Sequence, residues 1–184
     1  MTTTAVFAEI LVVGLEAEAW LAVLILAIFG TEWVDIGAVD QWTALLTILV
    51  LAAAYVLGIM VDRLADTLVP PKKRGHEDDD DGRPGFQDKR LLILHKSGGD
   101  GMAKFLDYQR SRMRVARGTV FNIALAIPAV VWFLWARTEA APAWIIGAGA
   151  IGMLMLALAF YTNERINHAY AENLEAAFRI VERV

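Results

Sequence analysis

Four long apolar runs, separated by polar segments, dominate the pattern along the chain. They cover residues 5–30, 41–66, 119–137 and 143–162. A helix needs about 20 residues to cross a hydrocarbon core, and each run reaches roughly that length. The sequence therefore predicts an all-α fold, a four-span transmembrane helical bundle. A soluble bundle would have to hide four fully apolar helices from water, for which a chain of 184 residues is too small.

The third and fourth apolar runs are predicted to continue as helices beyond the membrane. No helix breaker occurs between Gly101 and Pro128, so the third helix is expected to begin near Met102, well before its span. After the fourth run, apolar residues recur at helical spacing and form an amphipathic stripe: Ile166, Tyr170, Leu174, Ala177, Val181 and Val184. Such a stripe needs a partner, either the extension of the third helix or the same helix of another copy.

The distribution of basic residues predicts which side each segment occupies. Of 17 Lys and Arg residues, 13 lie within 63–117 and three follow Thr162, while only Arg137 lies on the opposite side. Because cytoplasmic segments are enriched in Lys and Arg, both termini and the two helical extensions are predicted to be cytoplasmic, with the spans in a cell inner membrane. Four tryptophans mark the opposite ends of the spans, as in an interfacial belt: Trp33, Trp42, Trp135 and Trp144.

This topology divides the chain into three parts. Residues 1–66 form a first transmembrane hairpin, 67–100 a cytoplasmic linker, and 101–184 a second transmembrane hairpin with its extensions. The linker contains Pro70–Pro71, a run of four aspartates and "GRPG", all typical of a solvated loop. The apolar segment "RLLILH" within it is too short to be assigned to a strand or a helix by periodicity.

The residues that enzymes need are sparse. The chain has no cysteine, its three histidines are scattered, and no zinc-protease, nucleophile-elbow or dinucleotide motif occurs. We therefore expect a protein that is not an enzyme and that holds no cofactor or metal. One alternative stays open, a carboxylate-only Mg²⁺ or Ca²⁺ site among Glu9, Glu16 and Asp62.

Carboxylates inside the first span are the most unusual feature of the pattern. A carboxylate at bilayer depth costs on the order of 2–3 kcal/mol. Glu9 and Glu16 share one helical stripe, whereas Glu18 lies about 200° around the helix from Glu16. Gly14 and Ala22 flank Glu18, so it belongs to a face of small residues. The two central glutamates therefore point to different neighbours.

Polar residues of the second span are predicted to meet those of the first. Tyr55, Gly58 and Asp62 share one stripe of the second span. If the ends of the two antiparallel helices align, three pairs lie at one level: Glu9 with Asp62, Glu16 with Tyr55, and Val13 with Gly58. Three carboxylates and a phenol would then share one seam.

Two interpretations of these polar residues remain open. In the structural one, Glu9 and Asp62 pair with arginines such as Arg63, Arg114 or Arg117, and the two central glutamates are protonated and hydrogen-bonded to Tyr55 or Thr47. In the functional one, copies of the chain surround an aqueous path lined by glutamates, which select cations. The candidates for this pore or polar seam are Glu9, Glu16, Glu18, Tyr55 and Asp62.

An arginine face lies on the predicted extension of the third helix. Arg110, Arg114 and Arg117 follow one another at helical spacing, with Asp107 at the foot of the same stripe. Guanidinium groups bind phosphate through two hydrogen bonds, so the face is a candidate site for a nucleotide, a single-stranded nucleic acid or an anionic lipid. The alternative is the general enrichment of Arg beside the cytoplasmic side of a membrane.

Four spans, the Arg-rich segment "DYQRSRMRVARG" and a helical tail together resemble the membrane channel subunits of nucleotide-signalled anti-phage defence systems, including the Hailong type. The resemblance implies a homo-oligomeric channel in antiviral defence, controlled by a nucleic-acid ligand that Arg110, Arg114 and Arg117 would contact. We therefore expect a homo-oligomeric ion channel gated from the cytoplasm by an anionic ligand. The competing hypothesis is a non-conducting membrane anchor or adaptor that holds a cytoplasmic partner through its helical extensions.

Overall fold

A computed structural model describes residues 3–32, 42–69, 93 and 100–182 of the chain. The four long helices are α1 (Thr3–Phe29), α3 (Thr43–Leu68), α5 (Asp100–Arg137) and α6 (Pro142–Glu182). The described residues contain no strand, so the predicted all-α class is confirmed. The third helix begins two residues before the predicted Met102, and α5 continues without interruption through Pro128. Most of the predicted linker lies outside the described residues.

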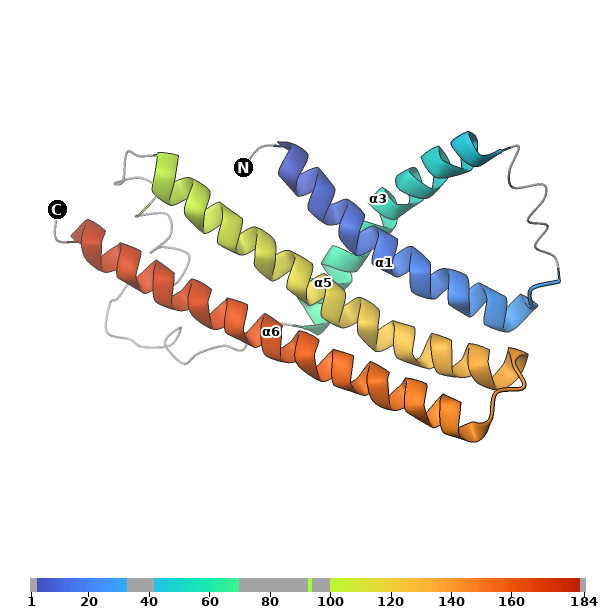
Figure 1. The fold of residues 1–184 in the computed structure, drawn as a ribbon. Helices are drawn as coiled ribbons and strands as arrows, with labels where there is room; N and C mark the ends of the chain where they lie inside the picture. Colours follow the sequence, from blue (N-terminus) through green and yellow to red (C-terminus); the bar gives the residue numbers. More distant parts are fainter. Residues whose placement is uncertain (1–2, 33–41, 70–92, 94–99, 183–184) are drawn as a thin grey trace.

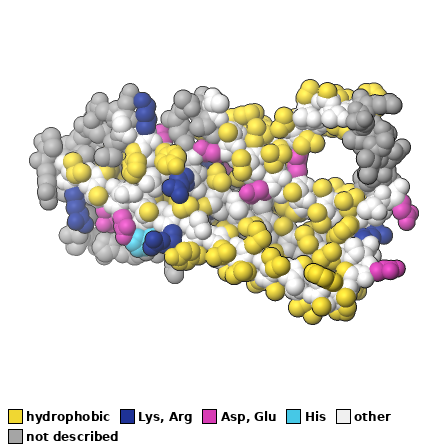
Figure 2. All heavy atoms as spheres, in the orientation of Figure 1, with side chains coloured by type: hydrophobic (Ala, Val, Ile, Leu, Met, Phe, Trp, Pro, Cys, Tyr) yellow, Lys and Arg dark blue, Asp and Glu magenta, His cyan; other side chains and the backbone are white. Residues whose placement is uncertain are grey.

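All four helices are long and apolar enough to cross a membrane, by length and composition. At most 22% of the residues in the most apolar window of any of these helices are buried within the chain. A soluble bundle buries its apolar stripes, whereas a helix in lipid presents them outward. On the face in Figure 2, hydrophobic side chains predominate in the right half, and charged side chains gather on the left, where α5 begins and α6 ends, and again at the far right end. This arrangement supports a multi-pass membrane protein.

Three helices lie side by side and the fourth crosses them. α1, α5 and α6 form one layer with α5 in the middle, and α3 crosses α1 and α5 at a large angle (Figure 1). α1 and α5 run in the same direction, while α6 returns antiparallel to α5 (Figure 1). Because α1 packs on both α3 and α5, its buried residues face two different neighbours.

Small residues form the crossing of α1 and α3. A Cβ atom at Gly14 would lie 1.6 Å from the carbonyl oxygen of Ala54, and one at Gly58 would lie 2.0 Å from that of Ile10. The two backbones therefore touch, as they do where small residues recur every four positions in membrane helices. The predicted pairing of Gly58 with Val13 is wrong by three residues. It assumed aligned helix ends, but the helices cross at their small residues instead.

The parts of α5 and α6 farthest from their connection pack on each other within the chain. Leu106 and Leu174 are fully buried against Tyr170 and Ala177, and Ile93 of the linker completes this cluster. The amphipathic stripe of the tail is thereby confirmed at Tyr170, Leu174 and Ala177, while the side chains of Val181 and Val184 lie outside the described part of the chain. Its partner is the extension of the third helix, the first of the two alternatives that the sequence left open.

Arg137, which the distribution of charge had singled out, caps the end of α1. Its Nε donates to the carbonyl oxygen of Ala27 at 2.8 Å, and its Nη2 donates to that of Ile28. Gly30 ends the helix with a positive φ of 83°, a conformation that side-chain-bearing residues rarely adopt. A cation suits this position because the last carbonyl groups of a helix carry partial negative charge.

The first half of α3 has no buried residue. Every residue from 42 to 53 is exposed, on all sides of the helix. The second half is different, because Ala54, Gly58, Val61 and Ala65 are buried at spacings of four, three and four. Only the second half of α3 has residues buried against the other helices, and the first half of α3 diverges from α1 and α5 (Figure 1).

Candidate functional site

Glu16 lies in the seam between α1 and α5. Its Oε1 accepts a hydrogen bond from Thr119 Oγ1 at 3.0 Å, and its Oε2 accepts one from Asn122 Nδ2 at 3.1 Å. Gly118 gives the two helices room to approach, since a Cβ there would lie 2.8 Å from a methyl group of Val13. The carboxylate at the centre of the span therefore has two donors from one neighbouring helix.

Asn122 connects three groups of α1. Besides donating to Glu16, its amide nitrogen donates to the carbonyl oxygen of Val13 at 2.9 Å, and its amide oxygen accepts from Trp20 Nε1 at 3.1 Å. Asn122 is 3% exposed. Asn122 is not among the site residues predicted from the sequence. Its signal was present, because a polar amide inside an otherwise apolar span needs a partner.

The predicted seam between the first two spans is therefore wrong in its composition. Glu9 and Glu16 do share a stripe of α1, but that stripe faces α5. Tyr55 of α3 packs its ring against Phe7, with ring centroids 5.1 Å apart. α3 packs on the face of α1 that carries Gly14. The stripe of Glu9 and Glu16 therefore faces α5 instead.

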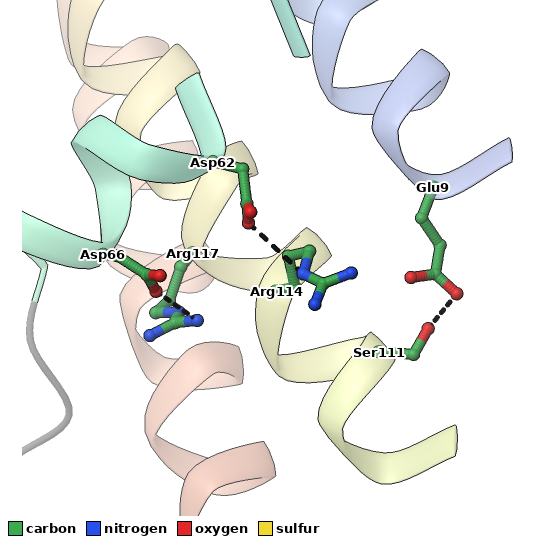
Figure 3. A network of polar contacts seen from close by, with 6 residues as sticks. All are labelled: Glu9, Asp62, Asp66, Ser111, Arg114 and Arg117. Carbon is green, nitrogen blue, oxygen red and sulfur yellow. Dashed lines mark hydrogen bonds and ion pairs between the residues drawn. The ribbon is translucent and has the colours of Figure 1, made fainter. Parts of the chain in front are cut away.

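Glu9 has one partner and one unused oxygen. Ser111 of α5 donates to Glu9 Oε1, and the two residues face each other across the helices in Figure 3. Glu9 Oε2 is buried and has no hydrogen-bond partner among the described residues. The predicted arginine partner of Glu9 is thus replaced by a hydroxyl, which leaves half of the carboxylate available.

Two ion pairs join α3 to α5, as Figure 3 shows. Arg114 Nε lies 3.4 Å from Asp62 Oδ1, and Arg117 Nη2 lies 2.6 Å from Asp66 Oδ1. The first pair confirms the predicted arginine partner of Asp62. Arg114 and Arg117 are only 28% and 16% exposed, so these pairs are partly desolvated. They fasten the second half of α3 to the bundle.

The arginine face is consequently divided. Arg114 and Arg117 are turned toward carboxylates of α3, whereas Arg110, one turn earlier, is exposed. Two of the three guanidinium groups predicted to bind a ligand already have partners in the same chain. Binding of a phosphate-bearing ligand at this face stays a prediction.

Glu18 has no hydrogen bond or ion pair with any described residue. It lies in the middle of the candidate span Val6–Phe29 and is partly exposed. Its stripe is that of Gly14, which packs on Ala54. One turn farther along α1, the crossing α3 diverges from it, and residues 42–53 of α3 are exposed (Figure 1). Glu18 therefore lies where the two helices diverge.

A groove of about 500 Å³ opens between α5 and α6 beside Glu9. The lining surface is mostly apolar, and three helices contribute to it. The lining residues are Glu9, Ser111, Arg112, Val115, Ala116, Thr119, Ala159, Thr162 and Ile166. Thr119 and Thr162 also mark the predicted ends of the third and fourth apolar runs. The groove thus lies where the apolar part of the bundle ends.

No group of three acidic, His or Cys side chains that suits a metal ion occurs within the described ranges. Glu9, Glu16 and Asp62 instead take separate partners on α5. The carboxylate-only metal site that the sequence left open is not formed by these residues.

Comparison with known proteins gives no family for this chain. No protein-family model matches it, and neither a curated protein nor a solved structure is significantly similar to it.

Proposed function

We propose that the chain is the subunit of a homo-oligomeric ion channel in the cell inner membrane, with Glu18 beside the conduction path. The observation that carries this proposal is the unpartnered carboxylate of Glu18 at the middle of an apolar span. Intramembrane carboxylates face other polar groups or water, because contact with lipid is costly. Glu16 satisfies this requirement within the chain through α5, and Glu18 does not.

The first half of α3 supports assembly from several copies. Four helices of one chain enclose no pore when three lie in a layer and the fourth crosses them (Figure 1). The diverging half of α3 and the adjacent α1 present Glu18 in the angle between them. A neighbouring copy packed into that angle would cover α3 and bring several Glu18 side chains around one axis, where rings of carboxylates select cations.

The second part of the proposal is regulation by an anionic ligand. Such a ligand would first contact Arg110, which is exposed. Arg114 and Arg117 hold α3, so a ligand that competes for them would loosen α3 from α5. Phosphate binding at Arg110 and its neighbours would thereby reach the helix that lies beside Glu18. A short single-stranded oligonucleotide and ATP are suitable probes, with channel current as the measurement.

The alternative function is a non-conducting membrane adaptor. It is favoured by the packed pair of helices beyond the apolar runs, where Phe105, Tyr108 and Ile180 are exposed beside a core of their own. An adaptor would hold a partner protein there, and its spans would serve as the anchor. The adaptor function does not explain why the unpartnered Glu18 lies in the middle of an apolar span.

Purified protein in planar lipid bilayers tests the proposal. The unmutated chain is expected to conduct with a preference for cations over anions, and Glu18→Gln is expected to reduce that preference several-fold. Glu16→Gln is the matched control, since its carboxylate points into the α1–α5 seam, and its selectivity should be unchanged. Mass measurement in nanodiscs should give three or more copies per particle.

Two results would refute the channel. One is a monomer in nanodiscs that carries no current under any ligand. The other is conduction whose ion selectivity does not change in Glu18→Gln. A stable monomer or dimer that copurifies with a soluble protein would instead support the adaptor.

A further inference from the structure

The groove between α5 and α6 combines an apolar wall with an unpaired cation. Val115, Ala159 and Ile166 supply apolar lining, and Arg112 stands at the same groove with no ion pair to any described residue. Arg112 is exposed, and its guanidinium lies 5.9 Å from the ring centroid of Tyr108. A ligand for this groove therefore needs an apolar body and a negative group.

Glu9 adds a negative charge to the same groove. Its Oε1 is engaged by Ser111, while the buried Oε2 has no described partner. A buried acceptor of this kind is costly unless a donor reaches it. A simple anion would face repulsion from Glu9, so the best complement carries a positive donor near its negative group.

Other buried polar atoms without described partners lie at the same level of the bundle. Asn163 Oδ1 and Asn167 Oδ1 lie one turn apart on α6. The antiparallel packing of Gly152 on Ile127, and of Leu174 in one cluster with Leu106, places these amides opposite residues 113–117 of α5, directly after Arg112. This level also coincides with the predicted ends of the apolar runs, where lipid headgroups meet the hydrocarbon.

We infer that the groove binds a phospholipid with a primary ammonium in its headgroup, such as phosphatidylethanolamine. The phosphate lies on Arg112, the ammonium donates to Glu9 Oε2, and an acyl chain follows the apolar lining toward the membrane. Guanidinium–phosphate and ammonium–carboxylate contacts are charge-assisted hydrogen bonds, which are the stronger class. A choline headgroup has no N–H to donate to Glu9, and a glycerol headgroup has no positive charge.

Native mass spectrometry of the purified full chain in detergent tests this inference. Phosphatidylethanolamine, phosphatidylcholine and phosphatidylglycerol with identical acyl chains are titrated separately. Phosphatidylethanolamine should bind about tenfold more tightly than the other two, the difference that one charge-assisted hydrogen bond makes. Phosphoethanolamine without acyl chains should not compete at equal concentration, because it leaves the apolar lining empty.

The variants separate the two ends of the headgroup. Glu9→Gln keeps an acceptor for Ser111 but loses its charge, so the preference over phosphatidylcholine should disappear. Arg112→Gln should weaken binding of all three phospholipids about tenfold. Arg179→Gln, at a side chain 73% exposed and outside the groove, should leave binding unchanged. Ala159→Phe fills the groove and should abolish retention even if Glu9→Gln fails to fold.

Three outcomes would overturn the inference. They are equal binding of the three lipids to the unmutated protein, an intact preference in Glu9→Gln, and no retained lipid at all. The last result would assign the groove to another occupant, such as the chain's own linker. Conduction is not measured here, so failure of the channel proposal would leave this result unaffected.

Discussion

Asn122 Nδ2 lies 3.1 Å from Glu16 Oε2, which assigns the central glutamate of the first span to the seam between α1 and α5. Both helices run in the same direction, so residues of one polar stripe meet in register along the seam (Figure 1). In this way Ser111, Thr119 and Asn122 of α5 donate hydrogen bonds to the carboxylates of α1. The glutamate without a partner in this seam is Glu18.

Replacing Asn122 by leucine should destabilise the bundle. The change removes three hydrogen bonds and leaves Trp20 Nε1 without its described acceptor. We expect a loss of about 1–3 kcal/mol in the free energy of unfolding, measured by denaturant titration in detergent. Thr119→Val removes a single bond and should cost about 0.6 kcal/mol. Equal stability of both variants and the unmutated protein would contradict the role of this cluster.

The crossing of α1 and α3 should not tolerate a methyl group at Gly14. Gly14→Ala places a Cβ atom 1.6 Å from the carbonyl oxygen of Ala54, so the helices must separate. We expect destabilisation of at least about 1–3 kcal/mol, as for other overpacked sites. Gly147→Ala on α6 is the matched control. It meets no heavy atom within 4 Å, and alanine favours the helix by up to about 1 kcal/mol.

The pair of Arg114 and Asp62 should show a measurable coupling energy. Arg114→Glu brings two carboxylates together where α3 packs on α5, and we expect a loss of about 1–3 kcal/mol in the free energy of unfolding. Reversing both charges should restore part of it, as a double-mutant cycle would show. Arg110→Glu, at an exposed position, should change stability little. A coupling energy of zero would mean that the pair does not hold α3.

Arg137 should stabilise the end of α1. Arg137→Met removes the donors to the carbonyl oxygens of Ala27 and Ile28, and we expect a cost of about 1–2 kcal/mol. Thermal unfolding in detergent is the measurement. Arg179→Met is the control, because the Arg179 side chain is 73% exposed and its pair with Glu175 spans 3.8 Å. If both variants melt alike, the cap contributes nothing.

Cysteine cross-linking should place the first half of α3 between copies. The chain has no cysteine, so a single introduced thiol reports one position. Ile48→Cys, at a position 67% exposed on α3, should form covalent dimers in membranes under oxidation. Ile146 of α6 is similarly exposed, at 71%, and Ile146→Cys should cross-link far less. The reverse order would move the proposed subunit contact from α3 to α6.

Much of the fold follows from local patterns in the sequence. The four apolar runs predicted the four helices, because length and hydropathy act on each segment by itself. The spacing of Tyr170, Leu174 and Ala177 predicted a buried stripe for the same reason, and that stripe is buried. Each of these inferences needs only the geometry of one helix.

The candidate site was less predictable, because it depends on contacts between helices. Helical periodicity correctly separated Glu16 from Glu18 and placed Glu9 with Glu16. It assigned that stripe to the wrong neighbour, since the register of two helices depends on where their backbones can touch. The small residues Gly14 and Gly58 decide this, and they turn α3 across the bundle.

The sequence by itself determined the four membrane-length helices of the described ranges, their apolar surfaces and the stripe on which each charge lies. Periodicity within one helix is a local property that the chain carries wherever it packs. Only the tertiary structure decided which helix faces which stripe. It also decided that Asn122 donates a hydrogen bond to Glu16, and that Arg114 and Arg117 form ion pairs with α3. These pairings arise from backbone approach at a few glycines, and no single helix contains that information.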